Sequence, residues 1–296
     1  MGVFEVRNLI GSSYIIPGPT NIGLIKNDRN IVIIDSGNDK DSGRKIRKYL
    51  DEKGWKLNSI INTHSNADHI GGNDYLQRNT NCKIYSTKAE KAFIETPIIE
   101  ASFLWGGYPN KDLWNKFFIA ESSQITDIIA KESVLLDGSI RIIELPGHFF
   151  EMIGVITSDK VAYIGDSIFD KNVLDKYKIP FVYNVKAYKE TIIKIKQTEA
   201  IYYVMSHGEV KTNINEIAEY NMKIIELIEE IILDVLRTPM IFEKILKAIC
   251  DKMLIELNCG QYALVGSTIK SFLSYLNNEN KIKYRFESNE MIWSIN

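Results

Sequence analysis

The sequence predicts an α/β layered fold. Short apolar runs alternate with amphipathic segments along the first two thirds of the chain, as strands alternate with helices in layered folds. Several apolar runs end in polar residues of the kind that bind ligands; the run at residues 31–34, followed by Asp35, is the first. Loops that a rigid sheet holds in place are a common location for chemistry. The pattern therefore predicts both the fold class and the position of a functional site.

The elements follow in order. Strands are predicted at residues 3–7, 12–16, 21–26, 31–34, 59–62, 83–85, 140–145, 161–164 and 201–205. A helix follows Asp41 and Ser42, which can cap it, because apolar residues recur at Ile46, Tyr49 and Leu50 with helical spacing. Further helices are predicted at residues 88–94 and 187–198. The same strand–helix cycle therefore repeats up to His207.

The pattern changes after His207. A long amphipathic helix is predicted at residues 214–236, and Pro239 then breaks the chain. A helix, a turn at residues 258–260, a helix at 266–277 and strands at 281–286 and 291–295 follow. We therefore expect two domains, residues 1–212 and residues 213–296.

Composition restricts the class of protein. The chain has 296 residues, of which 45% are hydrophobic and 25% charged, and a net charge of -2, so no strong global field attracts nucleic acid or an acidic membrane. Three cysteines without a CxxC pattern argue against a disulfide framework. Glu5 and Arg7 argue against a signal peptide, and no apolar run is long enough to span a membrane. We expect a soluble, cytoplasmic protein.

All four histidines stand where metal ligands are expected. His64 and His69 lie in the motif His64-x-Asn66-x-Asp68-His69 directly after a predicted strand, and the other two, His148 and His207, each follow a strand of their own. Asp166 ends a further strand and is placed to bridge two ions. Imidazole nitrogen and carboxylate oxygen together suit zinc, iron or manganese. The sequence therefore predicts a metal site.

These motifs resemble the metallo-β-lactamase superfamily over roughly residues 1–215. In that family His-x-His-x-Asp-His, then Gly-His, Gly-Asp and a final His build a site for two metal ions. The residues that match are His64, Asp68, His69, His148, Asp166 and His207. The resemblance implies an αββα sandwich, two mixed sheets packed face to face with helices outside.

One position departs from the family pattern. Asn66 stands where the motif has its second histidine, and a carboxamide oxygen is a weaker ligand than imidazole. Two groups are distinguished below: the first half-site contains His64, Asn66 and His148, and the second half-site contains Asp68, His69 and His207, with Asp166 between them. Only the second half-site has the full family set of ligands.

Four interpretations of the site follow. In the first, the protein binds two ions and holds the ion of the first half-site loosely; in the second, it binds one zinc ion at the second half-site. In the third, it binds one iron ion at His64, His148 and Asp166, an arrangement that resembles the site of the family's persulfide dioxygenases. In the fourth, the site is a non-catalytic remnant. Asn66 could also bind a metal-bound water. Elemental analysis and the variant Asn66→His separate several of these interpretations.

The main functional hypothesis is a metal-dependent hydrolase that acts on a small ester or thioester, similar to the glyoxalase II-like branch of the family. A metal-bound hydroxide would attack the substrate, and Asp68 or Asp166 would orient it and accept its proton.

Two further segments carry predictions. Residues 99–123 are the densest aromatic stretch of the chain and could form a lid or pocket wall, a dimer contact or plain core. Residues 240–296 resemble the winged-helix tail of some proteins of this family, including an endoribonuclease group, which makes a nuclease an alternative function. Residues 237–296 carry eight basic residues against six acidic ones, and this charge of only +2 favours packing or dimerisation instead.

Overall fold

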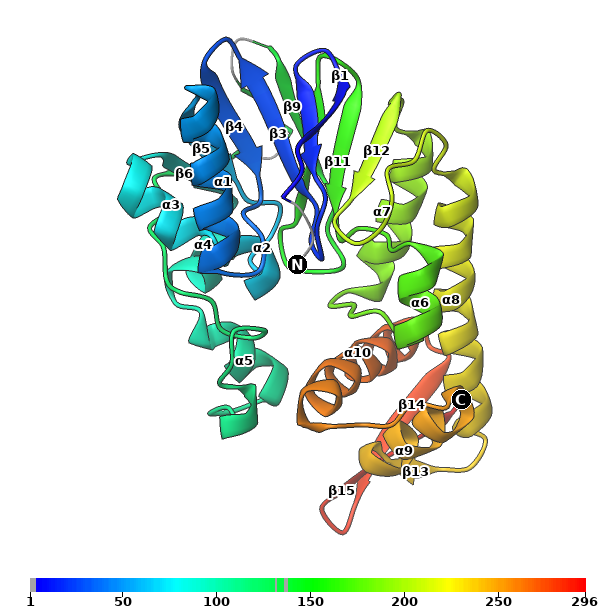
Figure 1. Cartoon of the computed structure of the whole chain (residues 1–296). Coiled ribbons are helices and arrows are strands. Elements are labelled where there is room, and N and C mark those ends of the chain that lie inside the picture. The colour runs from blue at the N-terminus through cyan, green and yellow to red at the C-terminus, as the bar shows by residue number, and fades with distance from the viewer. Residues whose placement is uncertain (1–3, 131, 136–137) are drawn as a thin grey trace.

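Two mixed sheets lie face to face with helices on both outer sides (Figure 1). The computed structural model describes residues 4–130, 132–135 and 138–296. In these residues the first sheet has the strand order β1-β2-β3-β4-β5-β6-β7 and the second the order β12-β11-β10-β9-β8. The strands of the first sheet are β1 (Arg7–Ile10), β2 (Ser13–Ile16), β3 (Ile22–Asn27), β4 (Asn30–Ile34), β5 (Lys56–Ile61), β6 (Lys83–Ser86) and β7 (Asp127–Ile128). Those of the second are β8 (Val134–Leu135), β9 (Ile140–Glu144), β10 (Ile153–Thr157), β11 (Val161–Gly165) and β12 (Tyr202–Met205). The αββα sandwich that the sequence predicted is confirmed.

Central strand β4 shows why the apolar runs are continuous. Val32 and Ile34 point into the cluster between the two sheets, where they meet Tyr163 of β11. Ile31 and Ile33 point to the other face and lie in the cluster beneath the outer helices. Because a strand covered on both faces has no solvent side, polar residues do not alternate along it.

The outer helices cover both sheets (Figure 1). Those over the first sheet are α1 (Lys40–Lys53), α3 (Asn73–Thr80) and α4 (Lys88–Glu95), and those over the second are α7 (Val185–Gln197) and α8 (Asn215–Val235). The predicted cap of α1 was wrong, since the side chain of Asp39 accepts hydrogen bonds from the backbone N–H groups of Asp41 and Ser42. Among the residues described, no helix combines the length and apolar character needed to cross a membrane.

Strand direction brings the motif residues to one edge of the sandwich. β4 and β5 are parallel, and β9, β11 and β12 also run in a common direction, because β10 is antiparallel to both β9 and β11. The carboxyl ends within each set therefore share an edge. The backbone N–H of Ile153 donates to the carbonyl of Thr63 at 2.9 Å and joins the two edges. Loops from both sheets meet at this point.

Several elements differ from the predictions. β10 and α6 (Lys171–Tyr177) were not predicted. β1 lies at Arg7–Ile10, whereas a strand was expected at residues 3–7, of which residue 3 lies outside the described residues. Helix α10 (Cys259–Asn278) begins seven residues before the predicted start at residue 266. Asn258 and Gln261 form a capping box there, so the segment read as a turn is the first turn of a helix.

The C-terminal region adds α9 (Phe242–Met253), α10 and an antiparallel sheet with the strand order β13-β15-β14. Its strands are β13 (Met240–Ile241), β14 (Ile282–Glu287) and β15 (Glu290–Ile295). One hydrophobic cluster runs from Ile164 and Tyr188 through Ile225 to Phe272 and Trp293. The core is thus continuous across residue 212; the domain boundary and the winged-helix interpretation stay predictions.

The aromatic insert contains α5 (Ile98–Trp105) and the short helix η1 (Lys111–Leu113). Leu104, Leu113 and Phe118 are buried in one cluster with Ala263 of α10. The insert extends below the helices of the first sheet (Figure 1), and its helices contact α10 of the C-terminal region.

Candidate metal centre

Asp35, at the end of β4, fixes the position of His69. Its backbone is left-handed, with a φ of 62°, and its carboxylate accepts hydrogen bonds from the backbone N–H and the hydroxyl of Thr63, at 2.8 and 2.7 Å. His69 Nδ1 lies 2.8 Å from Asp35 Oδ2. Because a carboxylate accepts here, Nδ1 carries the proton and Nε2 is left to face the cavity. The sequence had pointed to Asp35 only as a polar residue at the end of an apolar run.

The other three histidines are oriented in the same way. His148 Nδ1 donates to the carbonyl of Phe181 at 2.9 Å, and His207 Nδ1 donates to the carbonyl of Pro19 at 2.7 Å. The hydroxyl of Thr63 donates to Asp35, so its oxygen accepts from His64 Nδ1 at 3.0 Å. Each imidazole is thus held through Nδ1, which is how proteins fix histidine ligands of metals.

The four Nε2 atoms converge with the carboxylates of Asp68 and Asp166. His207 Nε2 lies 3.2 Å from Asp68 Oδ2 and 3.4 Å from Asp166 Oδ2. His69 Nε2 lies 3.4 Å from Asp166 Oδ1, and His148 Nε2 lies 3.7 Å from Asp166 Oδ2. Donor atoms about 2.1 Å from a tetrahedral ion lie about 3.4 Å from one another. The spacing therefore suits shared metal ions.

Unpartnered polar atoms support the same conclusion. His64 Nε2, His69 Nε2 and Asp166 Oδ1 are buried and have no hydrogen-bond partner among the described residues. Buried polar atoms rarely lack a partner unless an ion or water supplies one. The donor atoms form two sets that could each hold an ion: one of His64, His148 and Asp166, and one of Asp68, His69 and His207. The residues present thus fit the metal site that the sequence predicted.

Asn66 also points into this centre. Its amide nitrogen donates to Glu100 Oε1 at 2.7 Å, and its Oδ1 lies 3.0 Å from His148 Nε2. Because His148 already donates from Nδ1, a neutral ring presents a lone pair to this oxygen, and two lone pairs at that distance call for a cation between them. Glu100, buried in α5, therefore aims the carboxamide oxygen at the first half-site. The sequence contained no signal that would have identified Glu100.

The two half-sites differ in electrostatics. Burial lowers the pKa of His64 well below the usual 6.5 and also lowers the pKa of His148. Burial acts in the same direction on His69 and His207, but Asp68 and Asp166 outweigh it; the pKa of His207 rises to about 11 and that of His69 rises well above its usual range. Negative charge is therefore concentrated at the second half-site.

The carboxylates respond to the same charges. Burial raises the pKa of Asp68 and Asp166, yet the positive charges of His69 and His207 outweigh burial and hold both pKa values below the usual range. Thr20 also donates a hydrogen bond from its hydroxyl to Asp68 Oδ2 at 2.9 Å. Both aspartates are accordingly ionised and available to a cation.

A second buried carboxyl group supports the loop that carries His64. Glu90 of α4 accepts hydrogen bonds from the backbone N–H and the hydroxyl of Ser65, at 3.0 and 2.6 Å, and from the backbone N–H of Glu151 at 2.8 Å. Burial raises its pKa to about 7. Glu90 thereby connects the His64 loop to the loop that follows His148; the sequence had not singled it out.

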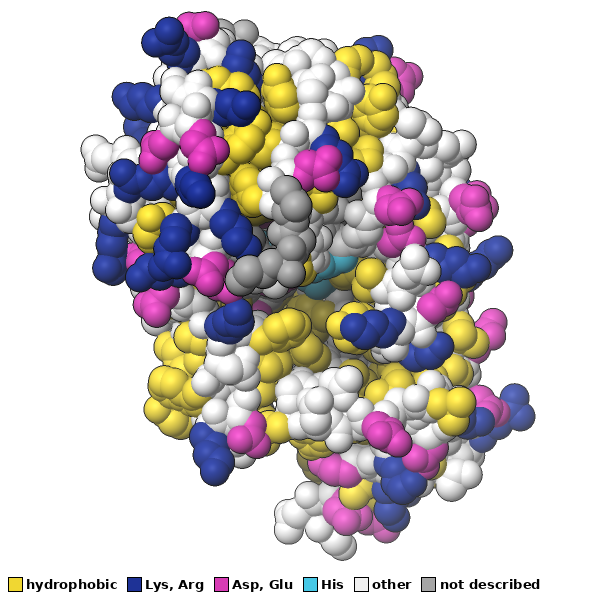
Figure 2. Space-filling view, in the orientation of Figure 1, with side chains coloured by type: hydrophobic (Ala, Val, Ile, Leu, Met, Phe, Trp, Pro, Cys, Tyr) yellow, Lys and Arg dark blue, Asp and Glu magenta, His cyan; other side chains and the backbone are white. Residues whose placement is uncertain are grey.

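A cavity of about 1020 Å³ opens from the metal centre toward the C-terminal region. Figure 2 shows histidine at the bottom of a hollow with hydrophobic side chains around it. Leu104, Phe117 and Phe118 of the aromatic insert line this cavity, so the insert forms a pocket wall, one of its predicted roles. The predicted dimer contact stays a prediction.

Comparisons with known proteins agree with this fold. Residues 15–207 match the family model of the metallo-beta-lactamase superfamily. A hydroxyacylglutathione hydrolase from Nitrobacter hamburgensis is 30% identical over 125 residues, which is 42% of this chain and 39% of that protein. A second one, from Haemophilus influenzae, is 28% identical over 158 residues, 52% of this chain and 68% of that protein. The match thus spans well under half the length of the Nitrobacter relative.

Solved structures resemble nearly the whole chain. A metallo-beta-lactamase family protein from Thermus thermophilus superposes with a TM-score of 0.77 at 16% identity and covers 98% of this chain and 100% of its own. A beta-lactamase domain protein from Burkholderia ambifaria has a TM-score of 0.79 at 15% identity, covering 99% and 94%. At such identities the likeness concerns the fold alone. From the family match and from the convergence of its motif residues, we conclude that this chain belongs to the metallo-beta-lactamase superfamily.

Proposed function

We propose that the protein is a metal-dependent hydrolase of esters or thioesters, with zinc as its metal. The observation that carries this proposal is the convergence of four oriented imidazoles and two ionised aspartates at the edge of a cavity. A set rich in nitrogen donors favours zinc, although iron and manganese also accept it. The hydroxyacylglutathione hydrolases to which the chain is similar support thioester hydrolysis.

The chain's own residues provide the acid–base chemistry. A bound zinc ion would lower the pKa of its water to about 7 and polarise the substrate carbonyl. Asp68 accepts a hydrogen bond from Thr20 on Oδ2, so its other oxygen can orient the attacking water and accept its proton. Asp166 lies against both half-sites through its two oxygens, Oδ1 toward His69 and Oδ2 toward His148 and His207. Asp166 would therefore provide a ligand atom to both half-sites.

One observation favours a second candidate function. His64, His148 and Asp166 form a set of two histidines and one carboxylate, which is the usual ligand set of mononuclear iron oxygenases. An iron-dependent sulfur dioxygenase would use this set, with Asn66 as an additional neutral donor beside it.

A nuclease finds less support. Lys281, Lys283 and Arg285 alternate along residues 281–286, but Lys281 pairs with Glu229 at 3.4 Å and Arg285 pairs with Glu287 at 3.2 Å. Charges that are already paired contribute less to phosphate binding. The nuclease would gain support if the purified protein bound RNA or DNA tightly at low ionic strength and released it as the salt concentration increased.

Elemental analysis together with an assay tests the proposal. We expect zinc in the purified protein, hydrolysis of a simple acyl thioester, loss of that rate with a chelator and its return on adding zinc. Asp68→Asn should lower the rate by at least about 100-fold, while Asp51→Asn, on the exposed face of α1, serves as the matched control. Iron in the protein with oxygen uptake would favour the dioxygenase instead. Absence of turnover in metal-loaded protein would overturn the hydrolase.

A further inference from the structure

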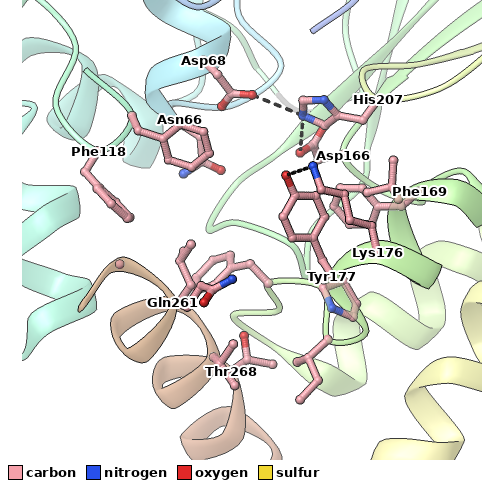
Figure 3. A pocket seen from close by; sticks show the side chains of 18 of the residues that line it. Asn66, Asp68, Phe118, Asp166, Phe169, Lys176, Tyr177, His207, Gln261 and Thr268 are labelled. Atoms are coloured by element: carbon pink, nitrogen blue, oxygen red, sulfur yellow. Dashed lines mark hydrogen bonds and ion pairs between the residues drawn. The ribbon is translucent and has the colours of Figure 1, made fainter. Parts of the chain in front are cut away.

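The cavity beside the metal centre has a wall that the catalytic fold alone does not supply. Helix α10 of the C-terminal region forms its floor, opposite Asp68, Asp166 and His207 (Figure 3). The residues of α10 that line it recur at helical spacing along one face: Cys259, Gly260, Gln261, Leu264, Val265 and Thr268. The C-terminal region therefore takes part in the binding site.

Apolar side chains dominate the other walls. Phe169, Ile179 and Phe181 lie on the segment around α6, and Leu104 and Phe118 come from the aromatic insert. Phe118 approaches α10 so closely that a Cβ at Gly260 would lie 3.0 Å from its ring. The insert and α10 are thus in direct contact, and together they line an apolar chamber next to the catalytic groups.

Few cationic side chains line the walls of the cavity beyond the metal centre. Among the described residues, Lys176 is the single lysine or arginine that lines the cavity, and its ammonium donates to the hydroxyl of Tyr177 at 3.1 Å. Asp112 lies on the same walls in addition to the two aspartates of the metal centre, whereas burial raises the pKa of Glu100 there well above its usual range. Away from the metal ions that the proposed hydrolase would hold, a nucleic acid, or a thioester whose thiol carries several carboxylates, would meet few compensating cations.

We infer that the substrate is an ester or thioester with a long apolar group, which occupies the chamber between the aromatic insert and α10. This inference rests on the proposed hydrolase function. A volume of about 1020 Å³ lies at the upper end of the range for drug-sized ligands, and an acetyl or lactoyl group would leave most of it unfilled. Apolar surface that stays wet contributes nothing to binding, whereas a long chain removes it from water.

Hydrolysis of this ester or thioester requires water as the second reactant and no other. The oxygen of water bonds to the carbonyl carbon, the bond from that carbon to sulfur or oxygen breaks, and the leaving thiolate or alkoxide takes up a proton. The products are a carboxylic acid and a thiol or alcohol. The apolar group can stand on the acyl side or on the leaving-group side of the bond, since the walls described above suit either.

Two series of thioesters test the inference and separate these sides. The first series joins acetyl, butanoyl, octanoyl and dodecanoyl groups to one small neutral thiol, and the second joins an acetyl group to alkyl thiols of the same lengths. Each buried methylene contributes up to about fourfold, so even about half of that gain at each of the added methylenes would raise kcat/KM by at least about 30-fold from the short to the octyl member of one series. Equal rates along both series, or a preference for S-lactoylglutathione over every long chain, would overturn the inference and leave the hydrolase standing.

A variant of α10 links the effect to the chamber. Leu264→Trp should reduce the preference for octanoyl over acetyl, or for octyl over ethyl, by about tenfold, because the indole occupies the space of the chain. Tyr262→Trp on the same helix, where the side chain is 40% exposed and does not line the cavity, should leave this ratio unchanged.

Binding measured without turnover keeps the two proposals distinguishable. Calorimetry with butanoic, octanoic and dodecanoic acids and with butanol, octanol and dodecanol should show affinity that increases with chain length in the wild type and falls in Leu264→Trp. If chain-dependent binding occurs but no thioester or ester is cleaved, the chamber is supported and the hydrolase fails. If neither chain-dependent binding nor chain-dependent cleavage occurs, the chamber is overturned.

Discussion

The two half-sites occupy one cavity edge but are built from different chemistry. The second half-site contains a carboxylate of its own, Asp68, and has Asp35 behind His69 at 2.8 Å. The first half-site contains two histidines whose pKa values burial lowers, and the neutral amide of Asn66. Because carboxylates attract a cation much more strongly than an amide dipole does, we expect the second half-site to bind its ion more tightly.

The first half-site depends on how the weak ligand Asn66 is oriented. A carboxamide can rotate, and either end could face the metal centre. Glu100 accepts from the amide nitrogen of Asn66 at 2.7 Å, which leaves the oxygen directed toward His148. The second half-site attracts an ion through the charge of its carboxylates. The first half-site instead depends on Glu100, a buried residue that positions the weak ligand Asn66.

Removal of a ligand from the second half-site should have the largest effect. His69→Ala should weaken the tightly bound ion by more than about 100-fold, because an imidazole oriented by Asp35 is lost. Competition with a chromophoric chelator measures this affinity. The matched variant His148→Ala removes an imidazole from the first half-site and should affect the tight ion less; the reverse order would show that the half-sites have been ranked wrongly.

Loss of the group behind His69 should have the next largest effect. Asp35→Asn preserves the shape of the side chain but removes the charge that orients and polarises the ring, and such changes typically cost about 10- to 100-fold in metal affinity. The same titration should show that the weakly bound ion is affected much less. An equal loss at both half-sites would mean that Asp35 acts through the whole loop, which it also holds through Thr63.

Replacement of Asn66 should make the half-sites more alike. Asn66→His supplies an imidazole in place of the carboxamide, and we expect about tenfold tighter binding of the second equivalent of zinc. Elemental analysis and calorimetry measure the gain. Unchanged stoichiometry and affinity would show that Asn66 does not limit the first half-site.

The smallest effect is expected at Glu100. Glu100→Gln should weaken the ion of the first half-site by about three- to tenfold, because the new side chain no longer fixes the direction of the Asn66 amide. Glu121→Gln, on an exposed residue that follows the aromatic insert's helices, is the control. A decrease that is equal at both half-sites would indicate a general loss of packing and contradict a specific role in positioning Asn66.

The chemistry of the site followed largely from local patterns. The order of strands and the strand-end motifs predicted one centre, and the structure brings its residues together because carboxyl ends of parallel strands meet at one edge: His64, Asp68, His69, His148, Asp166 and His207. The first and last residues of helices and strands were predicted less accurately. Gly260 suggested a turn although it lies in the first turn of α10, where it admits the ring of Phe118.

Local sequence by itself thus determined the strand periodicity, the ligand types and the departure at Asn66. Only the tertiary structure decided that Glu100 directs Asn66, that Asp35 holds His69, and that α10 closes the cavity. The physical reason is distance along the chain: both hydrogen bonds join residues 34 positions apart, and α10 lines the same cavity as Pro19 from the other end of the chain. No periodicity encodes such pairs; they arise when burial forces polar groups to find partners and apolar faces to share one core.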